Sequence, residues 1–305
     1  MGSQWEDPLW LAGAHGWIEA ELGRLGLRRS GDIEQPHVYP WSTVLRVPTD
    51  GGVVWFKANT PELEHEAAVV GLLSARRPDV VPPLLGVDLE RGWLLMADAG
   101  EPLRGIVARE RTFDPWLDVL PLYADVQLAL AGDVDELLAL GVPDLRLATL
   151  PARYEALLDE IDADQRLRAA VPRVAELCDE LAAYGIAETI QHDDLHDGQV
   201  FIRDGSPLIL DWGDACVSHP FFTLSVTLEG VLAWGFDDVE RSVDTVPFRD
   251  AYLGPFAARY DGDLVGAATI ALRLGWASRA VAAHAAGDRE NTPVRLRMFL
   301  DGSPG

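Results

Sequence analysis

Lysine is almost absent from this sequence, and positive charge is scarce. Of the 25 lysine and arginine residues only Lys57 is a lysine, and 49 aspartate and glutamate residues leave a formal net charge of −24. Binding to nucleic acid or to an anionic membrane requires a basic surface. We therefore expect neither as a partner. A small cationic substrate fits this charge, and so does a surface tuned for solubility.

Cysteine and long hydrophobic runs are also scarce. Cys178 and Cys216 are the only cysteines, too few for a disulfide framework. The sequence lacks a run of about 18 apolar residues, the length that a membrane-spanning helix needs. The first ten residues lack the basic segment and apolar core of a secretory signal. We expect a cytoplasmic protein, monomeric or weakly dimeric, in which both thiols stay reduced.

The hydrophobic pattern of the chain changes near residue 100. Before it, the pattern predicts a hairpin of strands at 43–48 and 53–58 with its turn at Asp50-Gly51-Gly52, and two more strands at 80–89 and 92–97. Helices are predicted at 5–25, from helical spacing, and at 60–76, where Thr60 is the expected N-cap. After a connector at 97–103, helical spacing prevails at 115–140, 150–184 and from 221 onward, with a strand at 207–210. The pattern predicts an α+β protein with a sheet-rich part, 1–98, and a helix-rich part, 99–305.

The stretch IQHDDLHDGQVFI at 190–202 crowds three carboxylates and two imidazoles into six positions. Gly198 and the clustered aspartates disfavour a helix, so we expect a loop. A carboxylate on such a loop, here Asp194, can accept a proton from a substrate hydroxyl or hold that hydroxyl in line for attack. The alternative is a metal-dependent hydrolase with His192 and His196 on zinc, although a spacing of four residues suits zinc only on a helix.

The same stretch and the strand after it supply candidate oxygen ligands for a metal ion. Gln199 offers an amide oxygen, and Asp211 comes directly after the apolar strand predicted at 207–210. Mg²⁺ prefers oxygen ligands, takes few of them from the protein and completes its shell with water and phosphate oxygens. We therefore expect Gln199 and Asp211 to bind Mg²⁺.

The only lysine lies at the end of the strand predicted at 53–58. Because arginine is otherwise used throughout, Lys57 is a candidate for a role that a planar guanidinium cannot fill. Glu66 lies beside the apolar stripe of the following helix, where a carboxylate is costly without a cation. A nearby cation would remove that cost.

HDDLHDGQVF followed by LILDWGDA resembles the H-x-D-L-H-x-G-N and strand-Asp signatures of the aminoglycoside phosphotransferase family. The resemblance implies a protein-kinase-like fold of two lobes. Residues 1–98 would form a small antiparallel-sheet nucleotide-binding lobe with an N-terminal helix and one key helix. Residues 99–305 would form a larger, mainly helical lobe for catalysis and substrate binding. It makes Asp194 the catalytic carboxylate and Asp211 a metal ligand, and it places Gln199 where the family has a metal-binding Asn.

The resemblance extends upstream. VVWFKAN looks like the strand that carries the phosphate-binding lysine, which gives Lys57, and HEAAVVGLL looks like the helix that carries its glutamate, which gives Glu66. LLMADAG is similar to the hinge where adenine docks, which implies contacts from Met96, Ala97, Asp98 and Ala99.

A glycine-rich loop is missing from the expected place. The segment before the strand at 43–48 reads HVYPWSTV. Backbone amides and the hydroxyls of Ser42 and Thr43 would then have to contact the phosphates.

We therefore expect a phosphotransferase that uses ATP and Mg²⁺ and acts on a hydroxyl of a small cationic molecule, such as an aminoglycoside-like antibiotic. The alternative acceptors are an amino sugar, a choline-like alcohol or another metabolite, because fold and motif do not choose among them. The Gln199 departure and the missing glycine-rich loop also permit a catalytically inactive nucleotide-binding module.

Overall fold

The computed structural model describes residues 4–237, 239 and 241–302. The chain forms two compact units. The first comprises Met1–Gly100 together with Phe201–Gly213, and the second comprises Glu101–Val200 together with Asp214–Gly305. The division of the sequence at residues 98 and 99 into a nucleotide-binding lobe and a catalytic lobe stays a prediction.

The first unit is built on a five-stranded antiparallel sheet with the strand order β1-β2-β3-β5-β4. The predicted hairpin is confirmed, with Gly52 in its turn at φ 110°. The sequence analysis missed the edge strand β1. The strands are β1 (Glu34–Val38), β2 (Ser42–Thr49), β3 (Gly52–Asn59), β4 (Leu84–Asp88) and β5 (Trp93–Ala97), and the later hairpin is β8 (Val200–Arg203) and β9 (Ser206–Ile209).

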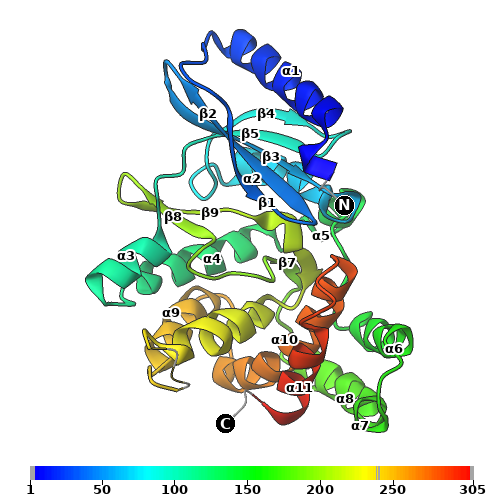
Figure 1. The fold of residues 1–305 in the computed structure, drawn as a ribbon. Coiled ribbons are helices and arrows are strands. Elements are labelled where there is room, and N and C mark those ends of the chain that lie inside the picture. The colour runs from blue at the N-terminus through cyan, green and yellow to red at the C-terminus, as the bar shows by residue number, and fades with distance from the viewer. Residues whose placement is uncertain (1–3, 238, 240, 303–305) are drawn as a thin grey trace. The chain divides into compact units, whose positions relative to one another are not determined.

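Helix α1 (Pro8–Leu25) lies alongside this sheet (Figure 1). Asp7 caps its first turn by accepting hydrogen bonds from two backbone N–H groups, and Gly26 ends it at φ 71°. Ile18 and Leu22 of the helix pack into one core with alternate β3 residues, among them Phe56. Since side chains alternate across a strand, this packing directs the remaining β3 side chains to the opposite face of the sheet.

The helix predicted at 60–76 is two elements. A short turn, η2 (Pro61–Leu63), precedes α2 (His65–Arg76). Thr60 makes no capping hydrogen bond with its side chain, although Pro61 does stand at the first helical position. Thr60 does occupy the expected N-cap position, at the start of η2.

The second unit is mainly helical. Helix α10 is buried along most of its length and packs against α11, α8 and α6, while α4 packs against α9. Its helices are α3 (Leu103–Glu110), α4 (Trp116–Leu130), α5 (Val134–Ala139), α6 (Leu150–Glu160), α7 (Gln165–Ala169), α8 (Val171–Ala182), α9 (Val246–Ala257), α10 (Leu264–Ala285) and α11 (Thr292–Asp301).

Short elements connect these helices. They are β6 (Glu101–Pro102), β7 (Thr189–Gln191), β10 (Cys216–Ser218), η3 (Trp212–Asp214), η4 (Pro220–Phe222), η5 (Ser225–Val231) and η6 (Leu232–Trp234), with η1 (Gln4–Glu6) at the start of the chain. Strands β7 and β10 pair antiparallel.

Two long predicted helices are broken in the structure. The segment 115–140 divides into α4 and α5 at Gly132, and 150–184 divides into α6, α7 and α8. Asp164 caps α7 by accepting from Leu167 N–H, which starts a new helix inside the apolar pattern. The patterns identified the helical regions correctly but not these interruptions.

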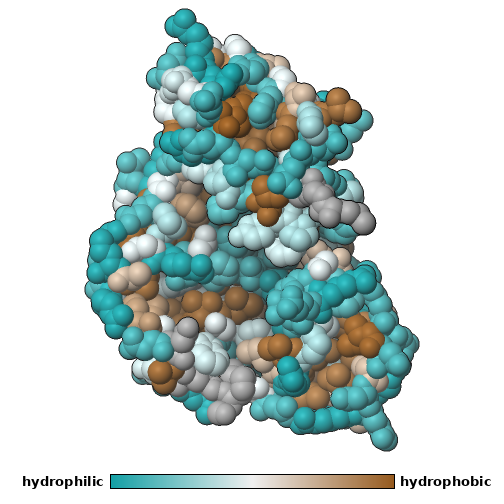
Figure 2. All heavy atoms as spheres, viewed as in Figure 1, coloured by the Kyte–Doolittle hydropathy of each residue, from teal (hydrophilic) through white to brown (hydrophobic). Residues whose placement is uncertain are grey.

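Hydrophilic residues predominate on the face drawn in Figure 2, and hydrophobic residues form separate patches there. The most exposed large hydrophobic side chains are Leu9, Leu89 and Val239. Among the described helices none combines the length and the apolarity that crossing a membrane would require.

Gly100 is held against the strand that follows the predicted catalytic loop. Its φ is 90°, and a Cβ atom added to it would overlap the backbone carbonyl of Ile202. We expect Gly100→Ala to lower the free energy of unfolding by about 1–3 kcal/mol, since both the backbone conformation and the close approach exclude a side chain. Urea unfolding followed by fluorescence measures this, with Gly13→Ala on α1 as control because an added Cβ meets nothing there. Equal midpoints for the two variants would contradict the expectation.

Candidate active site

Strand β3 places Lys57 on the sheet face opposite the α1 core. It lies between Val44 of β2 and Leu94 of β5 in the register of the sheet. The side chain is buried, and its ammonium reaches two carboxylates at once. Nζ lies 2.7 Å from Oε2 of Glu66 and 2.5 Å from Oδ1 of Asp211. The predicted pairing of Lys57 with Glu66 is confirmed.

Glu66 stands in the first turn of α2 and is 1% exposed. Besides Lys57 it has a second partner, because Asn59 Nδ2 donates to Oε2 at 2.5 Å. Asn59 also donates to Leu63 O at 3.1 Å, which ties β3 to η2. Sequence reasoning missed Asn59. Its signal was its place two residues after Lys57, on the same face of one strand.

The two carboxylates decide the charge of Lys57. Burial alone would lower the pKa of the ammonium, but Asp211 and Glu66 outweigh it and hold the pKa above its ordinary value. Lys57 is therefore a fixed positive charge at neutral pH. A compact cation held in this way on a strand can contact an anionic ligand without rearranging.

Asp211 follows β9 in the first unit, and its side chain is about half exposed, 47%. Its backbone has φ 62°, a left-handed conformation that Asp tolerates better than most residues. The neighbouring Trp212 is fully buried and donates to Ile209 O at 3.0 Å. Trp212 thus anchors the turn, and the carboxylate beside it stays accessible.

Ser42 and Thr43 begin β2, where phosphate contacts were expected. The Thr43 hydroxyl donates to His37 O at 2.8 Å and accepts from Gln35 Nε2 at 2.9 Å. Ser42 O accepts from Tyr39 N–H at 2.9 Å, so the backbone closes the turn between β1 and β2. The hydroxyl of Thr43 is engaged within the hairpin. Phosphate contact by either residue stays a prediction.

The predicted adenine segment spans the end of β5. Met96 and Ala99 are buried, and Ala97 is half-buried. Asp98 holds the segment in place: it accepts from Trp55 Nε1 at 2.8 Å and from Gly100 N–H at 2.9 Å, and its backbone oxygen accepts from Arg203 at 2.9 Å. Nucleotide contacts by these four residues stay predictions.

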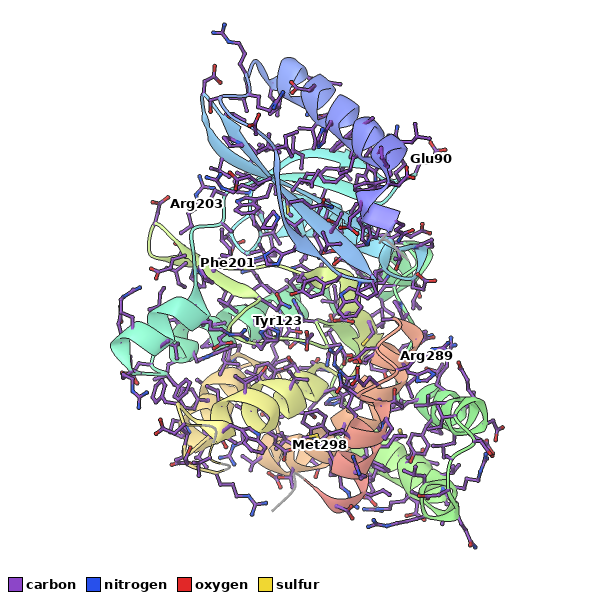
Figure 3. All side chains as sticks on the ribbon, in the orientation of Figure 1. Glu90, Tyr123, Phe201, Arg203, Arg289 and Met298 are labelled. Carbon is purple, nitrogen blue, oxygen red and sulfur yellow. The ribbon has the colours of Figure 1, made fainter. Side chains whose placement is uncertain are left out.

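In the second unit, the expected loop follows β7, and hydrogen bonds to residues of other elements hold it in place. His192 is fully buried, and its backbone N–H donates to the hydroxyl of Tyr123 at 2.8 Å. Tyr123 on α4 is labelled in Figure 3. Thr227 donates to Leu195 O at 2.8 Å. Asp193 lies between these anchors with φ 64°. The prediction of a loop rather than a helix is confirmed.

Arg279 of α10 reaches the carboxylates of this loop. Its guanidinium lies 3.0 Å from Asp193 Oδ2, 2.8 Å from Asp194 Oδ1 and 3.5 Å from Asp214 Oδ1. Arg279 and Asp193 are buried, whereas the Asp194 side chain is a quarter exposed. Sequence reasoning missed Arg279. Its signal was weak: it is one of two arginines in a helix made mostly of small and apolar residues.

The two adjacent aspartates have different protonation. Burial raises the pKa of Asp193 from 3.8 to about 7, because it outweighs the attraction of Arg279. Burial acts in the same direction on Asp194, but Arg279 and His196 outweigh it and hold that pKa below its ordinary value. At neutral pH Asp194 is therefore ionised, and burial makes Asp193 the easier of the two to protonate.

The rest of the loop is organised by His196. Its Nε2 lies 3.6 Å from Asp194 Oδ2, and its Nδ1 accepts from Gly198 N–H at 2.9 Å. Gln199 N–H donates to His196 O at 2.9 Å, in the second unit. Among the described residues no group of three or more His, Cys, Asp and Glu side chains is arranged to hold a metal ion.

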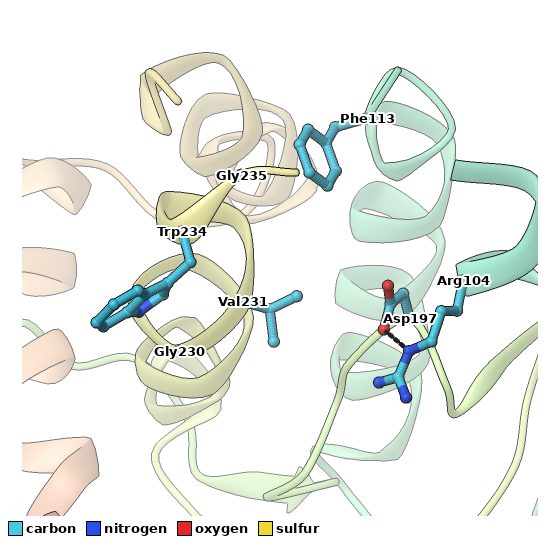
Figure 4. A pocket seen from close by; sticks show the side chains of 7 residues that line it. All are labelled: Arg104, Phe113, Asp197, Gly230, Val231, Trp234 and Gly235. Atoms are coloured by element: carbon cyan, nitrogen blue, oxygen red, sulfur yellow. Dashed lines mark hydrogen bonds and ion pairs between the residues drawn. The ribbon is translucent and has the colours of Figure 1, made fainter. Parts of the chain in front are cut away.

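A pocket of about 320 Å³ opens beside Asp197 in the second unit (Figure 4). Asp197 pairs there with Arg104 at 2.8 Å. The Val231 side chain points toward this pair, and Phe113, which stacks on Phe236 with ring centroids 4.2 Å apart, forms another wall. Trp234 lines the pocket with Gly230 and Gly235.

Comparison with protein families matches residues 37–266, most of the chain, to the phosphotransferase enzyme family. The chain belongs to this family. Lys57, Glu66, Asp194, Gln199 and Asp211 of this phosphotransferase all lie inside the matched range, and Arg279 lies outside it. The predictions of the family and of a phosphotransferase are confirmed. A search of curated proteins found no match.

Solved structures resemble this phosphotransferase along nearly its whole length. Ethanolamine kinase from Plasmodium vivax has a TM-score of 0.64 at 13% identity, covering 98% of this chain and 89% of that one. Aminoglycoside 2'-phosphotransferase-IIIa in its GDP complex has a TM-score of 0.60 at 13% identity, covering 95% and 98%. Macrolide 2'-phosphotransferase type I has a TM-score of 0.58 at 17% identity, covering 93% and 96%. The predicted α+β, protein-kinase-like fold is confirmed.

Proposed function

We propose that this phosphotransferase moves the γ-phosphoryl group of ATP to a hydroxyl of a small cationic molecule, with an aminoglycoside-like antibiotic as the first candidate. The observation that carries the proposal is the buried ammonium of Lys57 between Glu66 and Asp211. Such a cation supports the binding of phosphates, and the chain uses lysine nowhere else.

On the nucleotide side, Lys57 contacts the α- and β-phosphates. Glu66 holds the ammonium in place, and Asn59 in turn holds Glu66. The segment from Met96 to Ala99 takes the adenine. Ser42 and Thr43 remain the candidates for phosphate contacts from the β1–β2 turn. Lys57 needs no rearrangement to meet the triphosphate, because its charge is already fixed.

On the acceptor side, Asp194 receives the proton of the attacking hydroxyl and holds its oxygen in line. The new bond forms between that oxygen and the γ-phosphorus, and the bond to the β–γ bridging oxygen breaks, which releases ADP. A carboxylate with a lowered pKa is a weak base. Asp194 therefore contributes by orienting the hydroxyl as well as by accepting its proton while the new bond forms.

Asp211 and Gln199 would hold Mg²⁺. Their donors are a half-exposed carboxylate and an amide oxygen, the hard oxygen ligands that suit this ion. Bound there, Mg²⁺ would neutralise charge on the phosphates. The longer side chain of Gln199 replaces the Asn of the family pattern. We expect Gln199→Asn to retain turnover if the amide oxygen is what matters.

A coupled assay of ADP release tests the proposal. The acceptors are aminoglycosides, macrolides, peptide antibiotics, amino sugars, ethanolamine and choline, each tested with ATP and with GTP. Because the similar structures include kinases of antibiotics and of an amino alcohol, the panel must span both groups. Acceptor-dependent turnover with ATP is the expected result. Nucleotide binding without turnover on any acceptor would favour the inactive module instead.

The pocket beside Asp197 is our candidate for the acceptor site, since it opens three residues from Asp194 in the same unit. We expect Val231→Trp, which fills the pocket, to raise the acceptor KM at least about 10-fold, equivalent to about 1.4 kcal/mol, and to leave the nucleotide KM unchanged. Steady-state kinetics with each substrate varied in turn gives both constants. Val294→Trp on the exposed face of α11 is the matched control. Equal acceptor KM values in the two variants would place the acceptor elsewhere.

A further inference from the structure

The acidic cluster around the catalytic loop shares one cation. Asp193, Asp194 and Asp214 all lie within 3.5 Å of the guanidinium of Arg279. With every carboxylate ionised, three negative charges would face one positive charge in a largely buried place. Such an arrangement is costly unless the single cation is well placed.

The guanidinium is divided between two neighbours. Nη1 lies against Asp193 and Nη2 lies against Asp194, so the fork spans both adjacent carboxylates. A planar guanidinium carries N–H donors on separate nitrogen atoms and can pair with two carboxylates at once, whereas an ammonium is a single point charge. Asp193 is fixed further by Gln191 Nε2 at 3.3 Å and by its position after the anchored His192.

We propose that Arg279 is a positioning residue for catalysis: it clamps the carboxylate of Asp194 in its reactive orientation and keeps that carboxylate ionised. The proposal deepens the function proposed above and rests on it. Arg279 touches no substrate in this scheme and acts only through Asp194. It lies on α10, beyond the range matched to the family.

The charged and titratable groups around Asp194 point to the same role. Those on its own loop are His192, Asp193 and His196; those on other elements are Arg279 of α10 and Asp214 of η3, with Tyr123 and Cys216 next to Asp193. Arg279 is the strongest influence that lowers the pKa of Asp194. Removing the guanidinium would leave only His196 and His192, among the influences named above, to lower this pKa against burial and two further carboxylates, which raise it.

The test uses Arg279→Gln and Arg279→Lys. We expect Arg279→Gln to lower kcat at least about 100-fold at pH 6, the lower range of a general-base contribution, and to lose less at pH 8. The reason is the sign of the shift: when the pKa of Asp194 rises, acid protonates Asp194 and higher pH restores it. Arg279→Lys keeps the charge and so keeps the wild-type pH profile, but it lowers kcat because one ammonium cannot hold both carboxylates.

A second change sharpens the test. In the Arg279→Gln background, Asp193→Asn removes one of the opposing carboxylates and should move the acid limb of the profile back toward lower pH. Arg295→Gln is the matched control, since Arg295 of α11 is also a largely buried arginine and pairs with Asp288. It should leave the profile unchanged.

Titration of the Asp194 carboxyl by NMR with ¹³C-labelled aspartate needs no acceptor. It therefore separates a failure of this inference from a failure of the proposed function. A raised Asp194 pKa in Arg279→Gln is expected. An unchanged pKa, or a kcat loss that is equal at all pH values, would overturn the inference. If Arg279→Gln does not fold, Arg279→Lys decides: reduced kcat with an unshifted profile supports the clamp, and wild-type kcat refutes it.

Discussion

Asp194→Asn should reduce kcat roughly 1,000-fold while the nucleotide Kd stays within about 2-fold of the wild type, as for the loss of a positioned base. The amide keeps the size of the side chain but cannot take a proton. It also loses the charge that pairs with Arg279 at 2.8 Å. Nucleotide binding depends in our proposal on Lys57 and its partners, which belong to the first unit. Single-turnover kinetics and nucleotide titration measure the two effects separately.

The control for this variant is Asp204→Asn. Asp204 has a left-handed backbone at φ 52°, and its side chain is 94% exposed in the β8–β9 turn. It undergoes the same isosteric change away from any proposed role, so kcat should not change. A wild-type kcat in Asp194→Asn would remove Asp194 from the reaction. The role would then pass to another carboxylate of the loop.

Lys57→Met should abolish measurable turnover, weaken nucleotide binding and lower the free energy of unfolding by about 3–5 kcal/mol, the usual loss when one partner of a buried pair is removed. The stability loss arises because Glu66 is 1% exposed and, within the described part of the chain, would keep Asn59 as its one remaining partner. Lys57→Arg keeps the charge, so it should lose less stability. It should still lose activity, since a guanidinium cannot replace the compact ammonium between Glu66 and Asp211.

A double variant separates stability from chemistry. In Lys57→Met with Glu66→Gln, the uncompensated buried charge is gone, so part of the free energy of unfolding should return. Activity should not return, because the cation for the phosphates is still missing. Chemical unfolding and the ADP-release assay give the two quantities. Recovery of both stability and turnover would mean that Lys57 has only a structural role.

The sequence allowed much of the first unit to be predicted. Apolar segments separated by turn residues located β2, β3, β4 and β5, and helical spacing located α1 and α2. The edge strand β1 was missed, because its residues are mostly exposed and include a proline, so no buried face marks it. In the second unit the helical regions were recognised, but capping and local breaks decided where each helix ended.

The site shows the same limit. The pairing of Lys57 with Glu66 was implied by the family resemblance of the two segments that carry them, and the lone lysine and the glutamate beside an apolar stripe agreed with it. Arg279 could not be predicted. It stands 85 positions after Asp194, and nothing local marks it as the partner of a loop on β7. Its contact arises from the packing of α10 within the second unit.

The sequence by itself determined the family and named the candidate groups of the site, because both follow from short motifs of particular residue types. Only the tertiary structure decided how those groups are charged. The raised pKa of Asp193, the lowered pKa of Asp194 and the fixed charge of Lys57 all depend on burial and on partners distant in the chain. Electrostatic energies depend on distance in space and on exclusion of water, and neither quantity is encoded in the spacing of residues along the sequence.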